Sequence, residues 1–220
     1  MCGRYARFTP ADIYARLFDA EATVALAPRY NIAPSQPVLA ARNRPDGTRE
    51  MVALQWGLIP FWAKDPKTGY STINARAETV ASKPAFRQPF RQRRCLIAAD
   101  GFYEWQRTDG RKQPFYIRLR DGEPFAFAGL WEHWQRESEI IESCTIIVTQ
   151  ANSLVAAIHD RMPVILSKAD YDTWLNPQLQ DPSTLSPLLR PYPADSVVAS
   201  PIGLAVNNPR NEGPKLLSMP

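Results

Sequence analysis

Apolar residues recur along the chain in short runs that prolines and polar turns interrupt. Within residues 10–19, Ile13 and Leu17 stand one helical turn apart, and Thr9-Pro10 precedes them as a cap residue and a first-turn proline. This spacing predicts a short amphipathic helix. Most other runs are short and rich in β-branched and aromatic residues, which predicts strands. These runs are 51–59, 95–98, 102–106, 115–119, 125–130, 144–149, 162–166, 197–199 and 203–206.

The other segments predict loops and short helices. We expect a loop and then a strand over 30–41, a proline-divided helical pattern over 76–92, and one or two helical turns over 151–158. Ser167 is the expected cap of a helix over 168–175. Polar turns are expected at 109–110 and 121–122. No repeat or linker divides the chain, so the pattern predicts a single domain over 1–220. Its expected class is α+β, mostly β, with a curled sheet or open barrel-like core and short flanking helices.

The composition is that of a globular protein, with 45% hydrophobic and 22% charged residues among 220. The 21 prolines exclude long helices. No run approaches the roughly 18 apolar residues of a membrane span, and the first residues lack the apolar stretch of a secretory signal. We therefore expect the protein in the cytosol.

The cysteines exclude a disulfide framework. There are three, Cys2, Cys95 and Cys144, and an odd number in a reducing compartment predicts thiols. No CxxC pair is present and there are only two histidines, so we expect neither a zinc site nor any other metal or cofactor. Cys95 and Cys144 lie in apolar runs and are expected to be buried and inert.

The net charge is +4, and the positive charge is unevenly distributed. Residues 79–99 contain no acid and five basic residues, which are Lys83, Arg87, Arg91, Arg93 and Arg94. Two interpretations fit this segment: a nucleic-acid-binding face, or an ordinary solvated face. Charge alone does not separate them.

Cys2 stands where the chemistry of the amino terminus would matter. Loss of Met1 would leave an α-amine and a thiol on one residue. An α-amine titrates near 7.7–8.0, against about 10.4 for lysine, so it is far more often neutral and nucleophilic at pH 7. Such an amine attacks an aldehyde to give an imine, and the adjacent thiol closes a five-membered thiazolidine. The alternative is that Cys2 is merely a small buried residue.

Glu104 lies among aromatic residues on a predicted strand. By alternation it shares a face with Phe102 and Gln106, while Tyr103 and Trp105 lie on the other. In apolar surroundings its carboxyl group would have a raised pKa and could shuttle protons near neutrality. On a solvent face it would be an ordinary surface acid, and alternation does not decide between the two.

His159 and Asn74 are further polar candidates. His159 lies between a predicted helix and a predicted strand, where it could serve as acid, base or phosphate donor, or only as a structural hydrogen-bonding group. Asn74 could hold a nucleophile or an oxyanion, although a turn or a cap is the commoner use of this residue type.

Arginines and tryptophans offer candidate nucleic-acid contacts. Arg4 and Arg76 could bind phosphates, or could form surface ion pairs, for example with Glu78. Trp62, which with Phe61 precedes a polar stretch, is the better candidate for an exposed stacking residue. Trp56, on its apolar strand, is expected in the core.

Seven segments together resemble the SOS-response-associated peptidase (SRAP) family. In chain order they are MCGRY at 1–5, RYNIAP at 29–34, WGLIP at 56–60, INARAET at 73–79, ADGFYEW at 99–105, IHDRMP at 158–163 and VNNPRN at 206–211. They follow the family's order and span nearly the whole chain. One departure is Ala98, where many members have proline, and it touches no candidate catalytic group.

The resemblance implies a mostly β, barrel-like core and a function on damaged DNA. Members of the family find abasic sites in single-stranded DNA, crosslink to them covalently and shield them during the SOS response. The resemblance implies a nucleophile and partners at Cys2, Asn74, Glu104 and His159. It implies DNA contacts at Arg4, Arg76, Pro34 and Trp62. The expected protein is a monomer that removes its own Met1 and joins the nucleoid when bound to DNA.

Combining the two arguments, we expect Glu104 to assist ring opening of the abasic sugar and the Cys2 amine to attack C1′. Closure by the thiol gives the thiazolidine, and an imine that escapes closure would give weak lyase activity. Two other functions remain open. One is a thiol peptidase acting on other proteins through a Cys2–His159 dyad, and the other is a non-covalent reader of damaged or modified DNA.

Overall fold

A computed structural model describes residues 2–24, 26–108 and 110–219. Five strands form a closed barrel in the order β10-β4-β3-β6-β9, and pairing of β9 with β10 closes it. The bounds are β3 (Pro37–Asn43), β4 (Arg49–Trp56), β6 (Arg94–Ala99), β9 (Phe125–Arg136) and β10 (Glu139–Gln150). Two short strands, β5 (Asn74–Arg76) and β11 (Arg161–Pro163), also pair with β10. The α+β, mostly β class is confirmed, and the barrel is closed rather than open.

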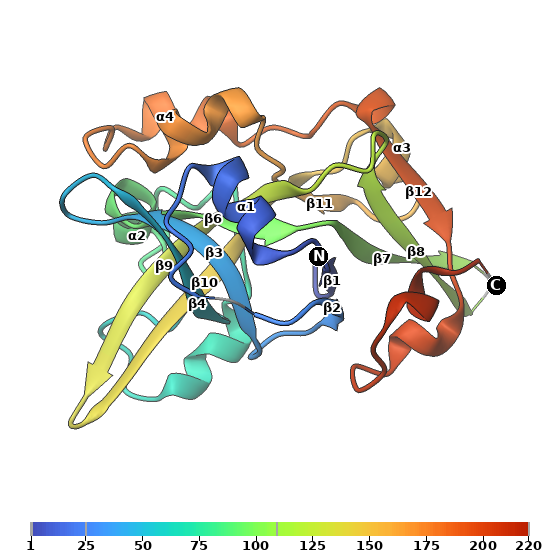
Figure 1. Ribbon diagram of the computed structural model, residues 1–220, viewed down its shortest axis with the longest axis horizontal. Coiled ribbons are helices and arrows are strands. Elements are labelled where there is room, and N and C mark those ends of the chain that lie inside the picture. Colours follow the sequence, from blue (N-terminus) through green and yellow to red (C-terminus); the bar gives the residue numbers. More distant parts are fainter. Residues whose placement is uncertain (1, 25, 109, 220) are drawn as a thin grey trace.

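A second sheet holds the amino-terminal strand β1 between β7 and the edge strand β2. Its order is β12-β8-β7-β1-β2, from β12 (Val197–Pro201), β8 (Arg111–Leu119), β7 (Gly101–Thr108), β1 (Tyr5–Arg7) and β2 (Arg29–Ile32). Figure 1 shows the two sheets side by side, with the carboxyl-terminal segment beside β8 and β12.

Helices are short and peripheral, as the proline content predicts. They are α1 (Ala11–Phe18), α2 (Arg87–Gln92), α3 (Ser153–Ala156), α4 (Tyr171–Leu175) and α5 (Pro182–Leu185). Short 3₁₀ segments are η1 (Pro66–Ser71), η2 (Lys168–Asp170), η3 (Ser186–Leu188), η4 (Ala194–Ser196), η5 (Leu204–Asn207) and η6 (Pro214–Leu217). Within the described residues, no helix has the length and apolar character needed to cross a membrane.

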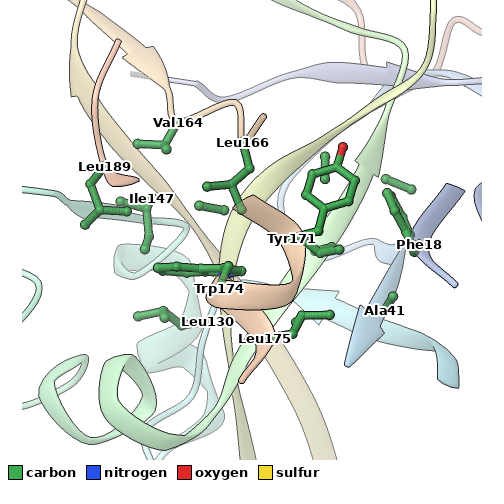
Figure 2. Packing of buried hydrophobic residues seen from close by; sticks show 14 of the residues in the cluster. Phe18, Ala41, Leu130, Ile147, Val164, Leu166, Tyr171, Trp174, Leu175 and Leu189 are labelled. Carbon is green, nitrogen blue, oxygen red and sulfur yellow. The ribbon is translucent and has the colours of Figure 1, made fainter. Parts of the chain in front are cut away.

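Alternation along the barrel strands divides the core in two. In β3, Leu39 packs on the cluster beneath the helices, where Figure 2 shows Trp174 and Tyr171 of α4. Its neighbour Val38 belongs to the other cluster, which contains residues of both sheets and also holds Cys2. Cys2 is therefore packed into the core that the barrel and the second sheet share.

Several local predictions are confirmed. The helix predicted over 10–19 is α1, and Trp56 is buried, with 1% of its surface exposed. The predicted turn at 121–122 is present. Of the turn predicted at 109–110, residue 109 lies outside the described residues.

Other local predictions differ from the structure at the start of a helix or over a short segment. Thr9 is not the cap of α1, because Pro10 holds that position and the Thr9 hydroxyl donates to Asp100 Oδ1 (2.5 Å). Residues 204–206 lie in the 3₁₀ turn η5, and Gly203 precedes it, so no strand forms there. For Thr9 a tertiary contact overrides local propensity, and for 203–206 a tight turn does. Ser167 holds the predicted cap position of the helical segment 168–175, which consists of η2 and α4, but its side chain makes no capping bond.

Gly101 allows β7 to pass close to a buried ring. A Cβ atom at this position would lie 2.5 Å from ring atoms of Tyr116, whose hydroxyl donates to Asp100 O (3.1 Å). Gly101→Ala should therefore lower the free energy of unfolding by about 1–3 kcal/mol. Urea denaturation measures this, and Gly203→Ala is the matched control, because nothing lies within 4 Å of its Cβ position. Equal stability of the two variants would contradict the packing argument.

Candidate active site

The pairing of β1 with β7 brings Cys2 beside Glu104. Tyr5 is opposite Phe102, and the N–H of Tyr103 donates to Arg4 O (3.0 Å), which continues the ladder toward the amino terminus. Each step back along β1 is a step forward along β7. Residues far apart in sequence therefore meet, and Glu104 and Cys2 interact electrostatically.

The Cys2 thiol is fully buried. Burial raises its pKa well above the usual range, and the nearby Glu104 carboxylate adds to the increase. The thiol is therefore protonated at neutral pH. This favours a group that adds to an electrophile formed beside it over a preformed thiolate nucleophile.

Glu104 is buried, so it faces the core rather than solvent, a choice that strand alternation had left open. Only 3% of its surface is exposed, and burial raises its pKa to about 7. Such a group is half-protonated near neutral pH, so it can both accept and donate a proton there.

A cavity of about 910 Å³ joins Glu104 to His159. Its walls come from β7, β8, the segment after α3 and η5. The lining residues are Glu104, Trp105, Gln106, Arg107, Lys112, Ala157, Ile158, His159 and Asn207. Two of them are fixed by hydrogen bonds, since Trp105 Nε1 donates to Asn207 Oδ1 (2.7 Å) and Gln106 Nε2 donates to Ala157 O (2.8 Å).

His159 is held in the neutral form. The N–H of Arg161 donates to His159 Nδ1 (3.0 Å), which leaves the ring proton on Nε2. Asp160 Oδ1 also lies 2.9 Å from Nδ1, a contact that would favour the protonated ring. Burial nevertheless lowers the pKa of His159, and the charge of Arg107 adds to the lowering. The neutral tautomer agrees with both the amide donor and the direction of this shift.

Asn74 begins β5, and the residue before it packs against the cluster that holds Cys2. Asn74 Nδ2 donates to Ile73 O (2.9 Å). Asn74 Oδ1 is buried and accepts no hydrogen bond from the described residues. An unsatisfied buried acceptor costs about 1–3 kcal/mol, so this oxygen suits a donor that arrives with substrate or with a freed amine.

Arg4 is tied into the protein by a network that the sequence did not reveal. Arg4 Nη1 donates to Asn31 Oδ1 (2.7 Å) and to Val206 O (2.9 Å). The buried Asn31 amide in turn donates to Asn208 O and Asn211 O (3.0 Å each). Asn31 thereby joins the RYNIAP and VNNPRN segments. Both motifs were identified in the sequence, but only the tertiary structure shows that they contact each other.

The remaining predicted DNA contacts lie outside the cavity lining. Arg76 is exposed, and the predicted ion pair of Glu78 is instead with Arg161. Pro34 is half-buried. Trp62 is 54% exposed, so the expected exposure of this side chain is confirmed.

The basic segment 79–99 is only partly a solvated face. Arg94 is buried and donates to main-chain carbonyls, including Phe90 O (2.8 Å), and Arg93 pairs with Glu132 (2.8 Å). Lys83, Arg87 and Arg91 are exposed. The buried thiols Cys95 and Cys144 are free, as predicted.

Comparison with known proteins places this arrangement in a family. The protein named "Abasic site processing protein YoqW" of Bacillus subtilis (strain 168) is 46% identical over 223 residues, covering 99% of each chain. "Abasic site processing protein YedK" of Escherichia coli (strain K12) is 30% identical over 224 residues, again covering 99% of each. "Abasic site processing protein HMCES" of Xenopus tropicalis is 31% identical, covering 87% of this chain and 66% of that protein.

The fold has a close match among solved structures. A crystal structure of a protein from Bacteroides thetaiotaomicron has a TM-score of 0.90 at 28% identity, with both chains covered in full. The family described as "SOS response associated peptidase (SRAP)" matches residues 1–209. These matches, over nearly the whole length, show that this chain belongs to the SRAP family.

Proposed function

We propose that this protein, acting as one 220-residue SRAP domain and as a monomer, captures abasic sites in single-stranded DNA through Cys2. Autocatalytic loss of Met1, which lies outside the described residues, exposes the Cys2 α-amine. The product is a covalent thiazolidine that protects the lesion during the DNA damage (SOS) response. The names of the relatives support processing of abasic sites, and the buried Glu104 beside Cys2 is the observation that carries the chemistry.

The proposed steps conserve atoms and charge. An abasic sugar opens from its hemiacetal to an aldehyde, and the Cys2 amine adds to C1′. Loss of one water gives the imine. The thiol then adds across the C=N bond, with sulfur joining carbon and the thiol proton passing to nitrogen. Glu104, with its pKa near 7, moves protons in the opening and dehydration steps.

Two neighbours complete the proposed site. Asn74 Oδ1, which lacks a partner among the described residues, accepts from the Cys2 amine and holds it toward the sugar. His159, neutral with its proton on Nε2, donates to the adjacent phosphate or returns a proton to the sugar oxygen. Glu104 also supports reversal, since proton transfer runs both ways. An imine that escapes the thiol gives weak lyase activity by β-elimination.

The burial of Cys2 weakens the case for a peptidase acting on other proteins. Such an enzyme needs a thiolate–imidazolium pair. Here burial raises the Cys2 pKa and lowers the His159 pKa, so both groups are neutral. Removal of Met1 is a single self-directed turnover and does not require that pair in a substrate cleft.

The test is a denaturing gel of the purified protein mixed with single-stranded DNA that contains one abasic site. We expect a shifted band that survives heat and SDS. Intact single-stranded DNA should give none, and the same lesion within a duplex should react more slowly because it must first be unstacked. Absence of the band, from protein whose mass shows loss of Met1, would contradict the proposal.

Trp62 tests the stacking part of the proposal. Because its side chain is exposed, Trp62→Ala should leave the free energy of unfolding unchanged. Stacking is worth about 1–3 kcal/mol per base, so non-covalent affinity for single-stranded DNA should fall by about 5- to 150-fold. Fluorescence anisotropy measures this, with the variant Tyr70→Ala as an exposed aromatic control. Unchanged affinity of Trp62→Ala would remove this residue from the DNA contacts.

A further inference from the structure

Two cations face each other across the β7–β8 hairpin. Arg107 is directly opposite Lys112 in the antiparallel register, and both side chains are exposed. Directly opposed side chains have their Cβ atoms about 4.5–5.5 Å apart, and like charges in this arrangement are destabilising. Such a pair costs stability unless an anion lies between the two groups.

The protein does not supply that anion among its described residues. Neither Arg107 nor Lys112 makes an ion pair or side-chain hydrogen bond with residues 2–24, 26–107, 110 or 112–219. By contrast, two half-buried arginines elsewhere are paired: Arg44 with Glu21 (2.6 Å) and Arg49 with Asp172 (2.6 Å). No described acidic side chain therefore neutralises the cross-strand pair.

The pair lies on the wall of the cavity that is lined by two of the candidate catalytic residues, Glu104 and His159. Arg107 and Lys112 line the same space of about 910 Å³ as Glu104 and His159. Arg107 is near enough to His159 to help lower the pKa of the imidazole, after the larger effect of burial. An anion bound at the pair would lie at one end of the reaction cavity.

The wall between the two ends is rigid. Trp105 is next to Glu104 and is held by Asn207, and Gln106 is held by Ala157 O. Glu104 and Arg107 lie three residues apart on β7, so their side chains leave opposite faces of the strand, and both residues nevertheless line the cavity. A chain with a regular repeat of anionic groups could thus contact the pair while its reactive sugar reaches Glu104.

We propose that Arg107 and Lys112 bind a phosphodiester of the DNA strand next to the abasic nucleotide. The proposal rests on the function proposed above and assigns a phosphate contact to the β7–β8 hairpin. A guanidinium fork and a compact ammonium together suit the two free oxygens of a phosphodiester. The contact sets the register of the strand, so that the lesion rather than a neighbour faces Cys2.

The experiment measures non-covalent binding, so that it does not depend on crosslinking. In a Cys2→Ala background, Arg107→Gln/Lys112→Gln is compared with Lys168→Gln/Arg190→Gln. The control removes one lysine and one arginine that are both exposed, Lys168 in η2 and Arg190 shortly after η3, 3.8 Å from Asp170. A cooperative melting transition in every variant, at a temperature close to or above that of the parent, establishes that the fold is intact.

Salt dependence of the affinity is the first readout. Each phosphate contact with a single strand contributes about 0.7 to the slope of log K against log salt. Because the two cations are proposed to neutralise one phosphate, Arg107→Gln/Lys112→Gln should reduce the slope by about 0.7 and weaken binding about tenfold at low salt. The control should keep the parent slope. An equal change in both variants would overturn the assignment, because it would report net charge alone.

A scan with neutral methylphosphonate linkages is the second readout. One neutral linkage next to the lesion should weaken binding to the parent protein and have no further effect on Arg107→Gln/Lys112→Gln. Equal effects in both would overturn the proposal. Competition by inorganic phosphate at constant ionic strength, without any linkage effect, would identify a free-phosphate site and also overturn it. Failure of wild-type crosslinking with these binding results intact would instead contradict the proposed function alone.

Discussion

Replacing Cys2 with alanine should abolish the heat- and SDS-resistant complex with abasic single-stranded DNA. The variant lacks the thiol that closes the thiazolidine, so any imine remains open to hydrolysis. The non-covalent affinity for DNA should not change, since binding is proposed to depend on cations and aromatic side chains. A denaturing gel and an anisotropy titration of the same preparations measure the two quantities.

Cys95→Ala is the matched control for the loss of a buried thiol. Cys95 lies on β6 and is fully buried in the same cluster as Cys2, and neither residue lines the cavity. This variant should crosslink like the wild type. A resistant band from Cys2→Ala would contradict the role of the thiol, and loss of affinity with loss of the band would favour a structural role for Cys2.

Replacing Glu104 with glutamine should slow crosslinking by about 10²–10⁴, the usual contribution of a general acid–base group. Glutamine preserves shape but cannot exchange a proton. The wild-type rate should also follow a titration near pH 7, where burial has placed the pKa of Glu104, and the variant should lose that titration. Single-turnover crosslinking from pH 5 to 9 measures both effects. A variant that keeps the pH dependence would place the titrating group elsewhere.

The same substitution should stabilise the fold above neutral pH. The pKa of Glu104 rises from 4.5 to about 7 on folding, so the folded state holds the proton more tightly. The contribution of Glu104 to the free energy of unfolding is therefore fully present below pH 4.5 and is lost as the pH rises through 7. A shift of this size corresponds to about 3 kcal/mol. Glu104→Gln should be more stable than wild type at pH 8 and similar at pH 5, as measured by urea denaturation. Lower stability at pH 8 would contradict the raised pKa.

Local pattern predicted most strands because apolar runs and turn residues are local signals. It did not predict that the barrel closes, since closure depends on the pairing of β9 with β10 together with the contacts of β10 to β4 and β5. Short strands such as β1 and β5 have no pattern of their own. They form because long neighbouring strands offer free edges.

The candidate site was predictable by residue type and not by geometry. The chemistry of an amino-terminal cysteine follows from its two nucleophiles, and the motif resemblance pointed to Glu104, Asn74 and His159. The burial of Glu104 could not be predicted from the sequence, because strand alternation fits a buried or an exposed face equally well. The hydrogen bonds of Asn31 could not be predicted either, because they join segments that are far apart in the sequence. Charge density in 79–99 was misleading in part, since Arg94 is a buried structural donor.

The most direct test of covalent capture is tandem mass spectrometry of the wild-type adduct after digestion of both protein and DNA. The account predicts a peptide that begins at Cys2, without Met1, and carries the sugar remnant with the loss of one water. Its thiol should resist alkylation, because sulfur is in the ring. A remnant on a lysine, or on a cysteine still preceded by Met1, would contradict capture by the Cys2 amine and thiol together.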